Sequence, residues 1–294
     1  MPGAPTGQVI TSDPLVRRIL APNPSPFTFT GTQTHIVGTG AVAVIDPGPD
    51  ISGHIDALLT ALAGEHVVAI VCTHTHRDHS PASRALQAAT GASIVGCAPL
   101  ASTGECDADE SFDAAYRPDR VLGDGERLEG EGWALEAVAT PGHTSNHLCF
   151  SLSGTGTLFS GDHVMGWSTS IVSPPDGDMG AYVASLAKLL GRSDTRYLPA
   201  HGEAVETPHK LVRGMILHRR QREAQILAAL AHGLRDIPAM VAGMYRGVDP
   251  RLHPAAARSV LAHLIDLERR GVVAREGEHW RLRSQLKIRH ETAT

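Results

Sequence analysis

The chain has 294 residues, of which 42% are hydrophobic and 19% charged, which is typical of a globular protein and excludes a disordered one. No apolar stretch reaches the roughly eighteen residues that a membrane-spanning helix requires. The first residues lack the layout of a secretory signal, and four cysteines are too few for a disulfide scaffold. We therefore expect a cytoplasmic, reduced protein.

The net charge changes sign along the chain. Residues 211–294 carry 15 Lys and Arg against 8 Asp and Glu, a net charge of +7, whereas residues 1–210 carry −12. Such a change usually marks two units with different surfaces. We predict one domain over residues 1–207 and a second over 208–294.

The first domain mixes strand and helix patterns, which were assigned from apolar periodicity and from turn residues. The predicted elements, in chain order, are strands over 35–38 and 41–45, a helix over 51–62, a strand over 67–72, a helix over 81–89, a strand over 93–96, a long surface loop over 99–127, strands over 133–139, 147–152 and 157–160, a helix over 179–190 and a strand over 196–199. The sequence therefore predicts an α+β fold.

The second domain is predicted to contain three helices and a hairpin. The helices cover residues 211–231, 237–245 and 254–270, and the hairpin pairs 271–275 with 279–282. This order is a winged-helix pattern, and with the +7 charge it allows binding of nucleic acid. The alternative is a domain that packs on the core, walls an active site or mediates a homodimer. That alternative is favoured, because a helix face with arginines is usually only solvated.

A cluster of potential metal ligands follows the apolar strand 67–72. His74, His76, Asp78 and His79 fall within six positions, and imidazole and carboxylate are ligands that zinc prefers. His74 and His76 share one side of an extended stretch, because side chains alternate with a period of two. Asp78 and His79 turn toward a second point, so we expect two metal ions rather than one. The alternative is a solvated, histidine-rich loop.

Three further candidate ligands follow later strands. His143 lies after the strand that ends at Ala139, Asp162 follows the strand at 157–160, and His201 follows the strand at 196–199. Neighbouring glycine and proline residues supply sharp turns at these strand ends. With the cluster they make five imidazoles and two carboxylates, enough for two divalent ions with open positions. Zinc is favoured, and manganese or iron would suit the same ligands.

At this point the chain resembles the metallo-β-lactamase fold superfamily. The resemblance rests on His74-x-His76-x-Asp78-His79 followed by His143, Asp162 and His201, and it covers residues 8–205. It implies a four-layer αβ/βα sandwich. It also implies that one metal takes His74, His76 and His143, that the other takes Asp78, His79 and His201, and that Asp162 bridges them. True β-lactamases of this fold commonly have cysteine at the position of Asp162, which points instead to glyoxalase II, lactonase and nuclease branches.

The chain is most similar to the beta-lactamase-like protein 2 group. This similarity rests on the segments 23–26, 31–34, 73–80 and 140–144. The group has Asn and Tyr where this chain has Gln33 and His35, so substrate contacts are expected to differ there. The group also carries a C-terminal winged-helix-like domain, which the predicted tail fits.

The expected activity is hydrolysis of a small carboxylic ester, thioester or lactone by a metal-bridging hydroxide, with Asp78 orienting the nucleophile and shuttling its proton. Two alternatives are a metal-dependent endoribonuclease acting on single-stranded RNA and a non-catalytic binding protein. Arg77 is the main cation near the cluster, which favours the first reading over phosphodiester cleavage. Trp167 either contacts the substrate or is ordinary packing.

Overall fold

The structure is a computed structural model and describes residues 5–100, 112–247 and 249–283. Contacts between Cα atoms divide these residues into two compact units. The first falls within Met1–Pro141, Asn146–Ser170 and Arg192–Leu211, and the second within Gly142–Ser145, Ile171–Gly191 and Val212–Thr294. The units are not contiguous in the chain, and the predicted boundary between residues 207 and 208 stays a prediction.

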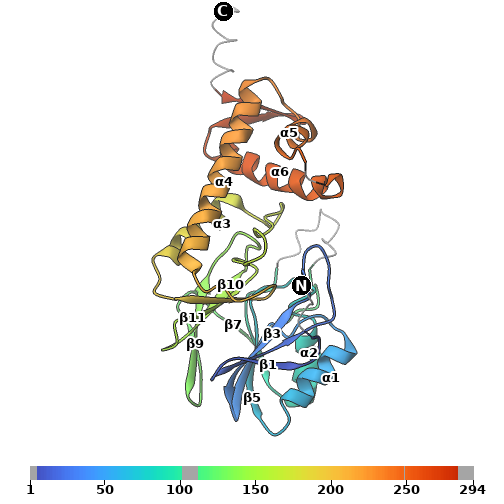
Figure 1. Cartoon of the computed structure of the whole chain (residues 1–294), viewed down its shortest axis with the longest axis vertical. Coiled ribbons are helices and arrows are strands. Elements are labelled where there is room, and N and C mark those ends of the chain that lie inside the picture. Colours follow the sequence, from blue (N-terminus) through green and yellow to red (C-terminus); the bar gives the residue numbers. More distant parts are fainter. Residues whose placement is uncertain (1–4, 101–111, 248, 284–294) are drawn as a thin grey trace, which may run out of the picture. The chain divides into compact units, whose positions relative to one another are not determined.

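The first unit contains a seven-stranded mixed sheet in the order β1-β2-β3-β4-β5-β6-β7 (Figure 1). Its strands are β1 Val9–Asp13, β2 Val16–Leu20, β3 Gln33–Thr39, β4 Ala41–Ile45, β5 His66–Cys72, β6 Ser93–Gly96 and β7 Arg120–Val121. The first four strands pair antiparallel, and β4 to β7 pair parallel. The parallel strands therefore end at the same edge, where the loops after β4 and β5 meet.

Two helices pack on this sheet, α1 Ser52–Ala61 and α2 Ala82–Thr90. Gly91 ends α2 in the left-handed region at φ 73°, a conformation that favours glycine at the end of a helix. Leu58 of α1 and Leu86 of α2 are fully buried in the same core as the strands. The apolar spacing that predicted the helix over 51–62 thus marks the face of α1 that packs into the core.

A second, five-stranded sheet has the order β12-β11-β10-β9-β8. Its strands are β8 Arg127–Gly130, β9 Trp133–Ala139, β10 Leu148–Leu152, β11 Thr157–Gly161 and β12 Arg196–Pro199. Side chains of the two sheets share one core, in which Phe150 and Phe159 lie with Ile36 and Ile70. The strand ends that carry the candidate ligands belong to both of these packed sheets.

Trp133 links the two sheets. Its indole Nε1–H donates to the carbonyl of Ala41 on β4 at 2.7 Å. Gly38 and Gly130 make room for the ring, because a Cβ at these positions would lie 2.5 and 2.3 Å from it. The hydrogen bond from Trp133 and the two glycines that lie against its ring fix the contact between the sheets.

The predicted surface loop over 99–127 is wrong in part. Residues 101–111 lie outside the described residues, but β7 falls inside the predicted loop, and Tyr116 and Leu122 are 1% and 3% exposed. These apolar side chains are isolated in the sequence and therefore show no periodicity. Strands β1, β2 and β8 were not predicted, because β1 and β2 contain charged residues and β8 is half-exposed.

The second unit contains the predicted three helices and hairpin, together with an additional helix, α3 Met179–Leu190. The other elements are α4 Pro208–Ala231, which begins in the first unit, α5 Ile237–Met244, the short η1 Pro250–Leu252, α6 His253–Arg269, and the hairpin strands β13 Val273–Glu276 and β14 His279–Leu282. Trp280, at 2% exposure, lies in a core with Leu264 and Leu267 of α6 and Met240 of α5. The helical spacing of these apolar residues explains why the pattern was readable. No helix in the described ranges is long and apolar enough to span a membrane.

His263 of α6 is buried in this unit without compensation. It is 2% exposed, and neither ring nitrogen has a hydrogen-bond partner among the described residues. Burial, followed by the nearby charges of Arg219, His218, Arg270 and Arg222, lowers its pKa from 6.5 to about 3. Folding therefore favours the neutral ring.

This burial predicts a specific acid sensitivity. Between about pH 6.5 and pH 3 the unfolded chain binds a proton at this histidine that the folded chain rejects, so stability falls as the pH drops through this window. At pH 5 the loss is on the order of 2 kcal/mol. His263→Phe should flatten this part of the pH dependence in denaturant unfolding. The exposed His279→Gln is the control, and an equal flattening in both variants would contradict the prediction.

Candidate metal centre

The candidate ligands follow the ends of strands in both sheets of the first unit, with one exception. His74, His76, Asp78 and His79 follow β5, Asp162 follows β11, and His201 follows β12. His143 follows β9, but its short loop, Gly142–Ser145, belongs to the second unit. Among the described residues, the candidate ligands form two groups. Within each group, one ligand atom of every residue lies within 4.8 Å of those of the others. The groups are Asp78, His79 and His201, and His74, His76, His143 and Asp162.

Four of these side chains form a tight cluster of opposite charges. The Nε2 atom of His201 lies 3.1 Å from Asp78 Oδ2 and 3.3 Å from Asp162 Oδ1. The Nε2 atom of His79 lies 3.3 Å from Asp78 Oδ2 and 3.6 Å from Asp162 Oδ1. Both imidazoles therefore direct the same ring nitrogen at the same two carboxylates.

The other ring nitrogen of each histidine is already occupied. Nδ1 of His79 donates to Asp46 Oδ2 at 3.0 Å, and Nδ1 of His201 donates to the carbonyl of Gly31 at 3.1 Å. A carboxylate or a carbonyl oxygen only accepts, so these contacts place one proton on Nδ1 and make Nε2 the nitrogen that can bind a metal once it has lost its own proton. Such partners fix the ring orientation of a metal-binding histidine.

Asp46 is a buried carboxylate beside the candidate ligands that was not predicted from the sequence. It is 2% exposed at the end of β4, with φ 49°, and it accepts hydrogen bonds from the Thr73 backbone N–H and hydroxyl, both at 2.8 Å. The Thr73 hydroxyl in turn lies 2.9 Å from His74 Nδ1. One carboxylate therefore orients His79 directly and His74 through a threonine.

His74 and His76 converge through different ring atoms. Nε2 of His74 lies 2.9 Å from Nδ1 of His76. Because Thr73 contacts the opposite nitrogen of His74, the atom pair that faces a common point is Nε2 of His74 and Nδ1 of His76. The alternation of side chains along the extended segment places them on one side, as predicted.

The residues present fit a cation. The buried Nε2 of His79 has no hydrogen-bond partner in the described ranges, although two carboxylate oxygens face it. Buried nitrogen and oxygen atoms directed at one another are a suitable donor set for a borderline divalent ion.

Mutual attraction shifts the pKa values of this cluster. Burial lowers the pKa of His201, but the Asp162 and Asp78 carboxylates outweigh it and raise it to about 10. The pKa of His79 moves well above its usual value in the same way. Burial raises the pKa of Asp78 and Asp162, but the imidazoles overcome it and bring both well below the usual range. Without a cation, imidazole protons balance the carboxylates, and a divalent ion would replace those protons.

Thr32, directly before β3, contacts Asp78, and Gln33 and His35 of β3 are buried nearby in the chain. The Thr32 hydroxyl donates to Asp78 Oδ2 at 3.4 Å, and the Asn23 side chain contacts both the hydroxyl and the backbone N–H of Thr32 at 2.9 Å. Gln33 is 4% exposed and donates to the carbonyl of Gly202, beside His201. His35 is 3% exposed, and burial followed by Arg18 lowers its pKa to about 3. Gln33 and His35, where different substrate contacts were expected, are therefore interior residues.

The His147 side chain supports Asp162 by a hydrogen bond to the Asp162 backbone. Its Nε2 accepts a hydrogen bond from the Asp162 N–H at 3.2 Å, while Nδ1 lies 2.9 Å from the hydroxyl of Thr140. A side chain at Gly161 would meet this ring, since a Cβ there would lie 2.7 Å from Nε2. The sequence analysis did not single out His147, because one histidine inside a strand-like run carries no distinguishing signal.

The loop of His143 is held by neighbours in its own unit. His143 Nδ1 donates to the carbonyl of Ile171 at 2.6 Å, and the Ser145 N–H donates to Asp176 at 2.8 Å. Segment 171–178 is in turn tied to α6, because Arg258 donates to the Pro174 carbonyl at 2.8 Å and Arg269 pairs with Asp178. Helix α6 thus anchors the segment that orients His143.

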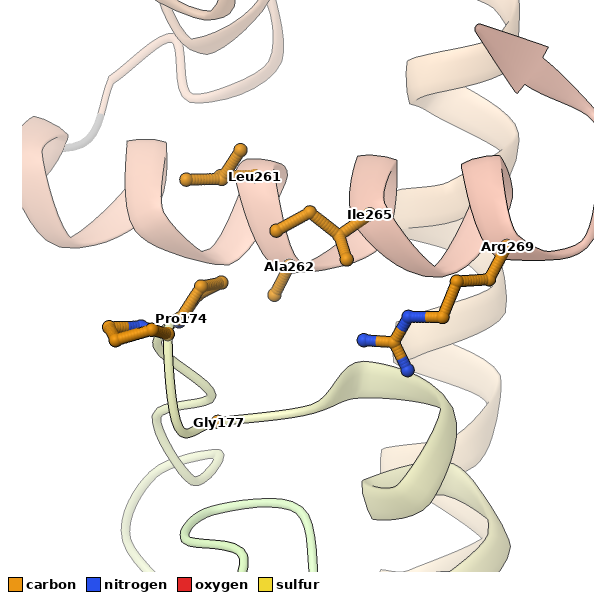
Figure 2. Close-up of a pocket in the computed structure, with 7 residues that line it drawn as sticks. Pro174, Gly177, Leu261, Ala262, Ile265 and Arg269 are labelled. Atoms are coloured by element: carbon orange, nitrogen blue, oxygen red, sulfur yellow. The ribbon is translucent and has the colours of Figure 1, made fainter. Parts of the chain in front are cut away.

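A cavity of about 410 Å³ lies between this segment and α6 (Figure 2). Its lining consists of Pro174, Pro175, Gly177, Leu261, Ala262, Ile265 and Arg269. The walls are mostly apolar, and the guanidinium of Arg269 points into the space between helix and loop.

Trp167 stacks on the ring of Phe29, with centroids 4.9 Å apart and planes 17° apart. It also packs against Gly202, where a Cβ would lie 2.8 Å from the indole. Trp167 is thus placed beside the neighbour of His201. Its contact with substrate stays a prediction.

Comparison with known proteins identifies the family. The model of the metallo-beta-lactamase superfamily matches residues 28–201, and that of the beta-lactamase associated winged helix domain matches residues 237–280. A beta-lactamase-like protein 2 homolog of Drosophila melanogaster is 33% identical over 268 residues, covering 87% of this chain and 88% of the relative. An atrochrysone carboxyl ACP thioesterase of Aspergillus fumigatus is 29% identical over 246 residues, covering 80% and 70%.

A beta-lactamase domain protein from Burkholderia ambifaria has the same fold, with a TM-score of 0.79, 20% identity and 94% of each chain covered. The predicted sandwich with a C-terminal winged-helix domain is therefore confirmed. The model of the metallo-beta-lactamase superfamily matches more than half of the chain, so the chain belongs to this superfamily.

Proposed function

We propose that this metal-dependent hydrolase cleaves a small carboxylic thioester, ester or lactone. The observation that carries the proposal is the cluster of Asp78, His79, Asp162 and His201, in which each imidazole presents Nε2 while Nδ1 is held by a partner. Relatives named as acyl carrier protein thioesterases support the thioester among these substrates.

Seven side chains would hold two divalent ions. His74, His76 and His143 would serve one ion, Asp78, His79 and His201 the other, and Asp162 both, with zinc favoured over manganese or iron. When bound, two such ions lower the pKa of water to near neutrality and stabilise negative charge that develops on the substrate oxygen. Asp162 groups with His74, His76 and His143, and its Oδ1 also lies near Nε2 of His79 and of His201, which supports its shared role.

Asp78 is proposed to orient the attacking water. Its side chain is 25% exposed, against 10% for Asp162, so it is the more accessible of the two carboxylates. The imidazoles and the Thr32 hydroxyl hold the pKa of Asp78 well below its usual range, so the carboxylate stays ionised. An ionised carboxylate accepts a hydrogen bond from the attacking water and so directs the lone pair of the water oxygen. A proton that the carboxylate takes from this water is held only briefly, because the pKa of Asp78 is low.

The chemistry of the leaving group also favours a thioester. A thiol has a pKa of about 8.5, so a thiolate can leave without a proton from a strong general acid. Phosphodiester cleavage would instead call for cationic side chains beside the reacting group. Arg77, the cation adjacent to the cluster in sequence, donates to the carbonyl of Phe112 and so holds a neighbouring segment.

The basic charge of the second unit does not by itself support the endoribonuclease alternative. Several of its arginines interact with residues of the same unit. Four form ion pairs: Arg269 with Asp178, Arg270 with Glu223, Arg251 with Asp249 and Arg281 with Glu276. A fifth, Arg222, lies over the ring of Tyr245. Paired and stacked arginines have less charge to offer to phosphates. The packing interpretation of this domain is therefore the better supported one.

The first test is elemental analysis followed by a substrate panel on the same preparation. We expect about two divalent ions per chain and saturable turnover of an acyl thioester or lactone, which a chelator abolishes. His76→Ala should lower kcat/KM on the order of 100-fold or more, because one ligand is lost. His66→Ala, at an exposed histidine that begins β5, is the matched control.

Two results would contradict the proposal. A well-folded protein that retains no transition metal would remove the hydrolytic mechanism altogether. Single-stranded RNA cleavage that persists through repurification and disappears in His76→Ala, without turnover of any ester, thioester or lactone, would replace the substrate class.

A second prediction concerns Asp46. Asp46→Asn keeps the shape of the side chain and tolerates the positive φ, but the amide cannot accept from both Thr73 and His79. Metal affinity should fall about 10- to 100-fold, as for other groups that orient metal ligands. Competition with a chromophoric chelator measures this change. The exposed Asp56→Asn controls for the loss of one negative charge, and an equal effect of that variant would count against the orienting role.

A further inference from the structure

The loop between β2 and β3 exposes two aromatic rings near the candidate metal centre. Phe27 is 57% exposed and Phe29 is 47% exposed, whereas large apolar side chains are normally covered. Of the two, Phe29 stacks on Trp167. The pair of Phe29 and Trp167 is called the aromatic platform below.

The loop is built to hold Phe29 in place. The Ser25 hydroxyl accepts from the backbone of Phe27 and Thr28 at 3.1 and 3.0 Å, and the Gly31 N–H donates to the Thr28 carbonyl at 2.9 Å. Gly31 itself has φ 132°, and a Cβ there would lie 2.2 Å from the Ala21 carbonyl. The loop is thus a hydrogen-bonded turn that positions the ring.

Phe29 adopts an unfavourable backbone conformation to present its ring. Its φ is 57°, in the left-handed region that bulky side chains rarely enter because of steric strain. Strain of this kind persists where the surrounding structure over-determines it, and such positions cluster at binding sites. An exposed ring held at this cost indicates a role beyond filling space.

Each residue of the aromatic platform is close in sequence or in space to a residue that contacts or adjoins His201. On one side, the carbonyl of Gly31, two residues after Phe29, accepts from His201 Nδ1. On the other, Trp167 packs against Gly202, which directly follows His201. A group that lies on the platform would therefore lie beside one of the candidate metal ligands.

We propose that the aromatic platform binds the acyl part of the substrate, and that the acyl group it prefers is planar and aromatic. The proposal rests on the hydrolase function proposed above and narrows its substrate class. Flat rings prefer offset stacking on other rings, and such a pair contributes beyond the area it buries. A flexible aliphatic acyl chain would gain contact area on the platform but not this additional term.

The first experiment measures binding without turnover. The metal-free full-length protein is titrated with 2-naphthoate and, separately, with decanoate, and tryptophan fluorescence is followed. Trp133 and Trp280 are 4% and 2% exposed, so Trp167 should supply most of the ligand-dependent signal, and Trp167→Phe checks this. We expect saturable binding of 2-naphthoate that Phe29→Leu weakens about threefold to tenfold, the loss of one stacked pair.

Leucine at position 29 keeps the apolar character and the backbone strain and removes only the flat ring. Phe27→Leu is the matched control, because it removes an exposed ring of the same loop that is not part of the platform. We expect that control to change binding less than twofold. Equal losses in both variants would overturn stacking on Phe29.

The second experiment uses the metal-loaded enzyme with a 2-naphthoyl and a butyryl thioester of the same thiol. Phe29→Leu should lower the ratio of the two kcat/KM values about threefold to tenfold. Binding of 2-naphthoate without turnover of any thioester would refute the hydrolase function but not the platform. Turnover without 2-naphthoate binding would refute the platform alone. An oligonucleotide that competes with 2-naphthoate and depends on Phe29 would show that the platform accepts nucleobases instead.

Discussion

The carboxylate of Asp46 is the constraint on which the geometry of the candidate centre depends. It lies at the end of β4, accepts from the backbone and hydroxyl of Thr73 after β5, and holds Nδ1 of His79. One buried charge therefore joins two parallel strand ends and fixes two imidazoles at once. A buried carboxylate is tolerated only when donors surround it, so the same contacts that orient the ligands also stabilise the turn.

Much of the centre could be predicted because its ligands follow apolar strands. The run over 67–72 located the start of the cluster, and alternation placed His74 and His76 on one side. Asp46 escaped prediction because its partners lie 27 and 33 residues away, and no local pattern links them. The left-handed backbone of Phe29 escaped for a different reason: a loop of Pro, Ser, Thr and Phe does not reveal which residue is strained.

The fold was predictable to the extent that each element carried its own period. Helix α6 buries Val260, Leu264 and Leu267 at helical spacing, so this part of the winged-helix pattern could be read directly. The edge strands β1 and β8 could not be read, because β1 carries polar residues on both faces and β8 has only four residues, too few to show a pattern. Net charge alone does not assign a function to the second unit, and four of its arginines, Arg251, Arg269, Arg270 and Arg281, form ion pairs within it.

The anchoring of the His143 loop has a consequence for how the protein is made. The loop is oriented by Ile171 and Asp176. Their segment is tied to α6 by Arg258, 84 residues downstream of Pro174, and by Arg269, 91 residues downstream of Asp178. Contacts between residues so distant in sequence form late, because closing a long loop costs entropy before any contact compensates. During synthesis from the N-terminus, the first sheet and the ligand segment 74–79 can therefore be in place while the His143 loop still lacks its anchor. The ribosome releases α6 after all strands of the two large sheets, so the loop gains its anchor only after those sheets have been made.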